Sequence, residues 1–525
     1  MNSNTGKNAA RSALIIIIFT LGSKVLGFLR ETLIAYRFGS GMQTDAFVIA
    51  LTATSVVTKL ISNAISTTFI PILSEIESKE GKEGKISHTN NLLNITGLIG
   101  IGLVLLSWVI APTLVKLFAK GFEEEQFALT VNLVKIGAPM VFFDVISGVI
   151  RGYLQSEQRH ASNAAVGIPF NIIYILFLLV FGSTFGIEGL MVTTVIATIS
   201  QFLILLPETI ISGFKYKFTF DIKDRYIKKA IYLSLPIFVG VAINDINAIV
   251  DKRLASYLVK GSISALNYAN KLKSLILSIF ISAITTVVYP MLSREVSDEN
   301  MDGVKKIINY GVDLIFLITI PATVGIVILA EPIVKVAFQK GEFDSLATMM
   351  TAQALLFYSI SIVISALRSL VTRVYYSLHD TKTPTINSAI TVATNIVFNL
   401  ILMGPMGHAG LALATSISIT PSTIWMYYRL RNKIGNLGLK SHLTNGLKIS
   451  AISLVMGVIS YFSYNGFFQL FGPGLMGTAI ALGLAVFLSV IAYGTMCYVF
   501  NVNVVRDMVN TGTYNLKKLV SERKK

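Results

Sequence analysis

Apolar stretches of about twenty residues alternate with short polar segments along nearly the whole chain. A helix rises 1.5 Å per residue, so about 20 apolar residues cross the ~30 Å hydrocarbon core of a bilayer. The pattern predicts about fourteen transmembrane helices. They cover approximately residues 13–35, 46–70, 91–115, 127–150, 162–182, 187–211, 230–256, 263–290, 308–330, 347–371, 384–404, 408–428, 446–466 and 475–499.

Composition supports a multi-pass membrane protein. Of 525 residues, 53% are hydrophobic and only 14% are charged, and the mean hydropathy is +0.68. So few charges cannot cover the surface of a soluble protein of this size. The fold class expected is therefore an all-α integral membrane protein.

The basic residues predict the orientation of the chain in the membrane. Loops on the side of the N-terminus hold 29 of the 44 lysines and arginines, and the opposite loops hold 8. Cytoplasmic loops carry such an excess, so we expect both termini in the cytoplasm. The net charge of +16 mostly reflects this topology, and no nucleic-acid partner is expected.

An internal repeat of about 220 residues divides the chain into two lobes of six helices each, followed by two additional helices. The matching pairs of segments are 69–75 with 288–295, 118–121 with 338–341 and 151–153 with 373–375. The predicted parts are an N-terminal lobe at 11–212, a cytoplasmic linker at 213–228, a C-terminal lobe at 229–430, two transmembrane helices at 444–500 and a basic cytoplasmic tail at 501–525. Parallel repeats of this kind are typical of transporters that bind cargo between lobes.

Six cations lie inside predicted transmembrane helices: Lys24, Arg30, Lys59, Lys271, Lys273 and Arg368. A cation at the centre of such a helix costs about 2.5–3.5 kcal/mol on insertion scales. Several together indicate a water-filled cavity and a negatively charged cargo. Lys24, Arg30, Lys59 and Lys271 are the candidate substrate-binding residues.

Polar residues repeat at helical spacing beside these cations. In the second helix, Asp45 and Lys59 fall on one face, and Asp45 is interpreted as a gating or structural partner. In the eighth, Asn267, Ser274 and Ser278 share a face with Lys271, and Lys273 points roughly the other way. The alternatives are that Lys273 reaches an interface, that Asp45 and Lys59 face headgroups, and that the serines serve helix packing.

Motifs of soluble enzymes are absent, so neither a catalytic residue nor a cofactor is expected. The sequence lacks a phosphate-binding Gly-x-x-x-x-Gly-Lys-Ser/Thr loop. Its five histidines lack metal-ligand spacing, and its one cysteine, Cys497, excludes an internal disulfide. Asp245, Asp251 and Asp380 form a candidate site for a monovalent cation.

Two segments of the chain carry a specific pattern of residues. The first comprises Gly27–Glu31, Ala35, Phe38-Gly39, Thr44–Phe47 and Pro71–Ser74, and the second is Gly261–Leu272. Both resemble signatures of the MurJ/MviN lipid II flippases. The resemblance runs over nearly the whole chain. It implies that Lys24, Arg30, Asp45 and Lys271 occupy positions required for activity in the family, and that Lys59 lies at or beside one.

The chain also departs from the family pattern. Lys24, Lys59 and Lys271 stand where the family usually has arginine. Asn270 replaces a frequent aspartate, and Ser278 and Ile281 replace glycines. Lysine lacks the bidentate fork of arginine, so affinity or cargo choice is expected to differ.

The resemblance implies export of undecaprenyl-pyrophosphate-linked peptidoglycan precursor, lipid II, across a bacterial plasma membrane. We expect alternating access, with membrane potential or a monovalent cation supplying energy and with cell-wall synthesis machinery as a candidate partner. The alternatives are a flippase for another polyprenyl-linked glycan and a cation-coupled drug antiporter. An antiporter for cationic drugs should carry carboxylates in its cavity, and the buried cations argue against it.

Overall fold

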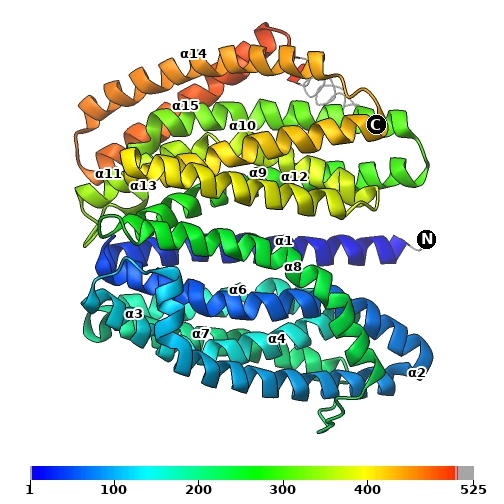
Figure 1. Ribbon diagram of the computed structural model, residues 1–525. Coiled ribbons are helices and arrows are strands. Elements are labelled where there is room, and N and C mark those ends of the chain that lie inside the picture. Colours follow the sequence, from blue (N-terminus) through cyan, green and yellow to red (C-terminus); the bar gives the residue numbers. More distant parts are fainter. Residues whose placement is uncertain (1–2, 503–504, 507–525) are drawn as a thin grey trace. The chain divides into compact units, whose positions relative to one another are not determined.

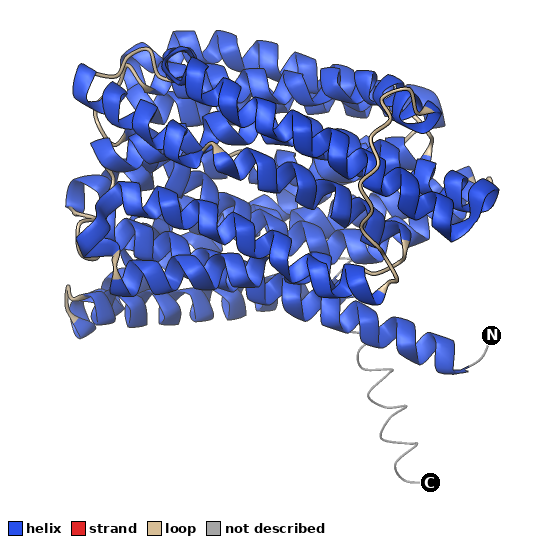
Figure 2. Ribbon diagram, turned by 90° about the horizontal axis from the view of Figure 1, so that it is seen from below, coloured by secondary structure: helices blue, strands red, loops and turns tan. Residues whose placement is uncertain are grey.

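The computed structural model describes residues 3–502 and 505–506, and this part of the chain consists of helices and loops without strands (Figures 1 and 2). It divides into two compact units. Unit 1 comprises Met1–Ser264 and Lys340–Ala347, and unit 2 comprises Ala265–Gln339 and Thr348–Lys525. The predicted all-α membrane fold, with about fourteen transmembrane helices, is confirmed.

Unit 1 contains the first eight helices. They are α1 Ser3–Phe38, α2 Met42–Phe118, α3 Glu124–Gly137, α4 Pro139–Ser156, α5 Ala161–Ala165, α6 Gly167–Val180, α7 Gly182–Ile211 and α8 Arg225–Ala255. Helix α8 packs along α2, and the Ser234 and Thr68 hydroxyls are 3.2 Å apart. This packing places α8 in unit 1, although it follows the linker at 213–228 in the sequence.

Unit 2 contains the remaining helices, except for the first residues of α9 and α11, which belong to unit 1. They are α9 Ser262–Ser297, α10 Met301–Phe338, α11 Ser345–Ser359, α12 Ile362–Ser377, α13 Lys382–Ile434, α14 Leu439–Phe471 and α15 Leu475–Val499. Figure 1 shows α14 and α15 side by side along one edge of this unit. The Tyr493 hydroxyl of α15 donates to the Leu317 carbonyl of α10 at 2.7 Å, which fixes the added pair to the lobe.

Some predicted transmembrane stretches share one long bent helix, and one predicted stretch is divided into two helices. Helix α2 carries two predicted stretches and bends at Gly81, and α13 carries two and bends at Gly407. Both glycines have positive φ, 70° and 55°, which a residue without Cβ adopts readily. The stretch at 127–150 is divided into α3 and α4 before Pro139, because proline lacks the N–H that a helix interior needs.

Eight helices of the described part are long and apolar enough to cross a membrane, and a ninth candidate is the bent pair α11–α12, at 46°. Helices α1, α8 and α9 carry further predicted stretches. The side chains of some residues in these three helices lie outside the described part of the chain. Helices α2 and α13 each carry two stretches.

The internal repeat is visible in the packing of each unit. Phe69, Leu73 and Tyr153 belong to one buried apolar cluster in unit 1. Their repeat equivalents Val288, Leu292 and Tyr375 belong to one buried cluster in unit 2. Each half therefore uses the same positions of the repeat to build its core.

Candidate functional site

Close packing between α1 and α6 positions the cationic segment of α1. A Cβ on Gly167 would lie 1.9 Å from the Ser23 hydroxyl oxygen and 3.1 Å from the Ser23 Cβ, so the lack of a side chain at Gly167 lets the two helices approach closely. The Asn171 side-chain amide donates to the Ser23 carbonyl at 3.1 Å. Small residues and polar bridges of this kind hold helices together within a membrane.

Arg30 lies on this segment and faces α6. Its Nη2 donates to the Glu31 carboxylate at 2.6 Å, and its side chain is 17% exposed. The guanidinium carbon lies 5.4 Å from the Phe170 ring centroid and 5.2 Å from the Tyr174 centroid. The aromatic faces and the carboxylate hold the guanidinium in one orientation.

The Arg30 guanidinium retains capacity for a ligand. Its Nε is buried and has no hydrogen-bond partner among the described residues. A buried donor without a partner is uncommon in folded proteins and calls for an explanation. An anionic oxygen at this donor would supply one.

The other two candidate cations of unit 1 lie on α1 and α2. Lys24, six residues before Arg30 on α1, is half-buried. Lys59 lies on the α2 backbone, but its side chain lies outside the described residues. Its role in binding stays a prediction.

In unit 2 the two lysines of α9 have different surroundings. Lys271 is exposed, whereas Lys273 is half-buried with its ammonium 4.8 Å from the Tyr358 ring centroid. Residues two apart on a helix point about 200° from each other. The aromatic contact gives Lys273 a packing role and leaves Lys271 on the polar face.

The remaining polar residues of that α9 face differ from one another in exposure and in hydrogen bonding. Asn267 is half-buried and Ser274 is exposed. The Ser278 hydroxyl donates to the Leu275 carbonyl of its own helix at 2.9 Å. A serine that only serves helix packing also makes such a bond to its own helix, so this bond does not indicate a binding role.

Segments from both sequence halves meet within unit 1 at residues 36–45, 256–264 and 340–347. We call them the outer closure, after the side of the membrane on which the predicted orientation of the chain places them. The buried Asp45 carboxylate accepts hydrogen bonds from the Gly261 N–H, the Ser264 N–H and the Ser264 hydroxyl, each at 2.7 Å. Asp45 thereby caps the N-terminus of α9 from another helix, where a negative charge is favourable. The three bonds tie the start of α2 to the start of α9.

Two glycines bring backbones together in the outer closure. Gly39 and Gly341 have φ of 61° and 60°. An added Cβ would lie 2.3 Å from the Glu342 carbonyl oxygen at Gly39, and 2.3 Å from the Tyr36 carbonyl oxygen at Gly341. The Glu342 N–H also donates to the Tyr36 carbonyl at 2.9 Å. This face of unit 1 is closed by main-chain contacts.

The three carboxylates of the candidate cation site have separate surroundings. Asp251 accepts from the Asn247 amide at 3.1 Å. Asp245 lies two residues before Asn247 on α8 and is half-buried. Asp380 accepts from Thr383 and pairs with Lys433 at 3.1 Å in unit 2. Among the described residues, no group of three or more histidine, cysteine, aspartate or glutamate side chains is arranged to hold a metal.

Sequence reasoning missed the immediate partners of Arg30. Glu31 follows it directly and is only 8% exposed, so an acid–base dipeptide inside an apolar stretch was the available signal. Phe170 and Tyr174 are spaced by four on α6 and looked like ordinary lipid-facing or core aromatics. Only the fold places them against the guanidinium.

Comparison with known proteins shows one family across the chain. The profile described as "Lipid II flippase MurJ" matches residues 34–482. A "Probable lipid II flippase MurJ" of Rickettsia prowazekii is 27% identical over 498 residues, which covers 91% of this chain and 96% of that protein. The Vibrio cholerae protein of the same description is 30% identical and covers 78% of this chain and 81% of its own length.

Solved structures agree with this comparison. A structure titled "Lipid II flippase MurJ, inward closed conformation" superposes with a TM-score of 0.79 at 26% identity, covering 94% of this chain and all of that one. An inward-facing multidrug resistance MATE family transporter superposes with a TM-score of 0.68 at 13% identity, covering 81% of this chain and 98% of that one. The second likeness extends to the fold alone.

Proposed function

The chain belongs to the MurJ family and is a lipid II flippase of the bacterial inner membrane, and we propose that it carries the pyrophosphate of lipid II on Lys24, Arg30, Lys59 and Lys271. It is a transporter and not an enzyme. The observation that supports the anion site best is Arg30, which Glu31 and two aromatic rings hold in a transmembrane helix. Its buried Nε has no hydrogen-bond partner among the described residues.

The balance of charge favours an anionic headgroup. Glu31 neutralises part of the positive charge of Arg30. Any further cation in the same cavity repels the Arg30 guanidinium. A pyrophosphate brings several acceptor oxygens and negative charge, so it reduces the repulsion among the cations and supplies the Nε with a partner. The polyprenyl tail stays in lipid, because exposing each CH₂ to water costs about 0.8 kcal/mol.

We assign Asp45 a gating role in this cycle. The outer closure holds one side shut through three hydrogen bonds to a single carboxylate. Release of the headgroup on that side requires these bonds to break. Alternating access of this kind is general for transporters built from repeats.

Resetting the cycle requires an energy source, for which we propose the membrane potential. Moving a unit charge across 100 mV yields about 2.3 kcal/mol. A monovalent cation at the candidate site, Asp245 or Asp251 with Asp380, is the alternative source. Both termini are assigned to the cytoplasm from the distribution of basic residues, and the cell-wall synthesis machinery is the expected consumer of the exported precursor.

Complementation tests this function. Expression of the chain in cells depleted of their own lipid II flippase should restore growth and bring lipid II to the outer leaflet, where an externally added lipid II-cleaving toxin can reach it. Restored export of a different polyprenyl-linked glycan, with lipid II still held inside, would assign the chain to that cargo instead.

A further inference from the structure

An apolar pocket of about 780 Å³ lies in unit 1 between α2, α4, α7 and the linker that follows α7. Helix residues such as Gly97, Phe142 and Phe202 form its walls. The volume lies within the range of small-molecule sites, about 300–1,000 Å³. None of the candidate residues for headgroup transport lines it.

Every second residue of the linker contributes to the wall of the pocket. Phe214, Tyr216, Phe218 and Phe220 line it, and Lys215, Lys217 and Thr219 alternate with them. Successive side chains of an extended segment point to opposite sides. The aromatic side of the segment therefore faces the pocket, and the lysines lie on the other side.

Asparagines of α2 hold this segment in place. The Asn90 amide donates to the Lys215 carbonyl and the Asn94 amide to the Thr219 carbonyl, both at 2.9 Å. The Tyr216 hydroxyl donates to the Asn94 side-chain oxygen at 2.7 Å. The segment thus has a defined conformation although it forms neither helix nor sheet.

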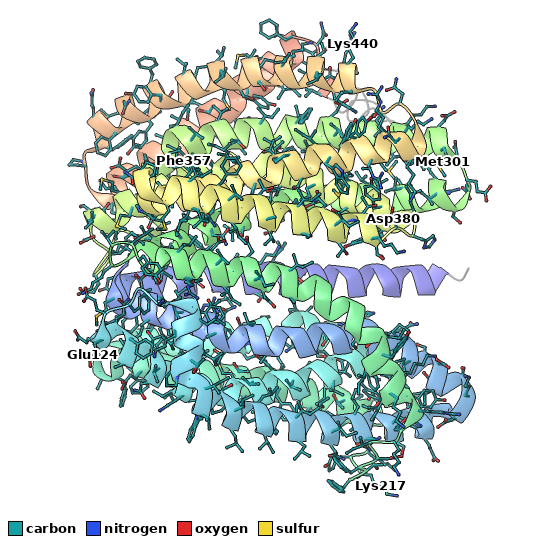
Figure 3. All side chains as sticks on the ribbon, viewed as in Figure 1. Glu124, Lys217, Met301, Phe357, Asp380 and Lys440 are labelled. Carbon is teal, nitrogen blue, oxygen red and sulfur yellow. The ribbon has the colours of Figure 1, made fainter. Side chains whose placement is uncertain are left out.

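The two lysines of the segment are free to meet a headgroup. Lys215 and Lys217 are exposed, and Figure 3 shows Lys217 at the edge of the molecule, outside the helices of unit 1. Aromatic side chains gather at membrane interfaces, and basic residues beside them attract the anionic lipids of the cytoplasmic leaflet.

We propose that this pocket binds one anionic phospholipid of the inner leaflet, with an acyl chain among the aromatic residues and the phosphate at the rim, where the long, flexible side chains of Lys215 and Lys217 reach around the segment to it. The apolar lining matches hydrocarbon, and the paired lysines match the negative headgroup. The lipid would fasten the linker between α7 and α8 to the membrane. This site is separate from the one proposed for lipid II.

Native mass spectrometry of the purified full chain tests the proposal, with palmitoyl-oleoyl phosphatidylglycerol and the matching phosphatidylcholine as probes. We expect one tightly held phosphatidylglycerol and weaker phosphatidylcholine. Lys215→Gln with Lys217→Gln should weaken phosphatidylglycerol binding about fivefold per lysine. Lys223→Gln with Lys228→Gln removes the same charge from exposed positions of the same region and should change little.

A second pair of variants tests the pocket itself. Gly97→Phe places a ring in the pocket, where an added Cβ has its nearest neighbours at 3.9 Å. It should abolish the retained lipid. Gly102→Phe, at an exposed site with nothing within 4 Å, should leave it bound.

Three results would overturn the proposal: equal retention of the two phospholipids by the wild type, equal effects within either pair of variants, or stoichiometric displacement of phosphatidylglycerol by undecaprenyl phosphate. The last would assign the pocket to a polyprenyl chain. None of these results bears on lipid II export, which the complementation assay measures independently.

Discussion

Replacement of Asp45 by asparagine should open the outer closure. The carboxylate accepts three hydrogen bonds at 2.7 Å from Gly261 and Ser264, and it is 2% exposed. Asparagine presents one oxygen and turns a donor amide toward N–H groups, so at least one bond to a charged acceptor is lost. Such a bond contributes about 1.5–3 kcal/mol, and the helix N-terminus adds about 0.3–1 kcal/mol.

The neutral amide is easier to bury than the carboxylate, which offsets part of this loss. We therefore expect the closed form to lose about 1–3 kcal/mol relative to the open form, a shift of about 5- to 150-fold. Labelling of a cysteine buried in the closure reports this shift, because its rate follows the open population when closing is fast.

Ser262→Cys in a Cys497→Ser background provides the reporter. Ser262 is fully buried and its hydroxyl has no hydrogen-bond partner among the described residues, so the thiol is a mild replacement. A membrane-impermeant maleimide added from outside should label it about 5- to 150-fold faster with Asp45→Asn. Glu124→Gln, an exposed acid at the start of α3, is the control. Labelling within twofold of the parent, or an equal rise with the control, would refute the capping argument.

Three further outcomes are expected. Lys271→Ala should reduce lipid II export at least tenfold. Lys273→Ala loses the Tyr358 contact and should lower thermal stability more than export. Equal export defects would contradict the assignment of the two lysines to different faces of α9. The double variant Ser40→Cys with Ser264→Cys should form a disulfide, because the two serine hydroxyls are 2.8 Å apart. The disulfide should block export until it is reduced, and export by the cross-linked protein would contradict the gating role of the outer closure. Burial favours the neutral form of Asp224, but hydrogen bonds from His88, Tyr226 and Asn91 lower its pKa below the usual value. The loss of melting temperature in Asp224→Asn should therefore be full above about pH 4 and shrink as pH falls through the lowered pKa; a loss that stays the same size as pH falls below about 4 would contradict the assignment.

Much of the fold is readable from the sequence because a bilayer imposes a strict length and polarity on each helix. The repeat positions Leu73 and Leu292 could be paired by motif alone, and both lie in the cores of their units. Helix breaks were harder to predict. Nothing local distinguishes Gly81, which bends α2, from Gly84 three residues later, which lies in regular helix.

The site could be predicted only as a set of charges. A cation in an apolar stretch is visible in the sequence, but the direction of its side chain is not. The Arg30 rings come from α6, about 140 residues away, and the Asp45 partners come from residues more than 210 positions away. Such contacts depend on helix packing, which hydrophobic periodicity does not specify.

The central claim is that cations within transmembrane helices carry the headgroup of lipid II, and export by charge variants tests it most directly. The measurement is the amount of lipid II accessible at the outer leaflet in flippase-depleted cells that express each variant at equal membrane levels. Arg30→Ala and Lys271→Ala should fall to the level of depleted cells, since each removes a charge from the proposed site, and Lys223→Ala should match the wild type. Accessibility at the wild-type level in both the Arg30 and the Lys271 variants would contradict the claim.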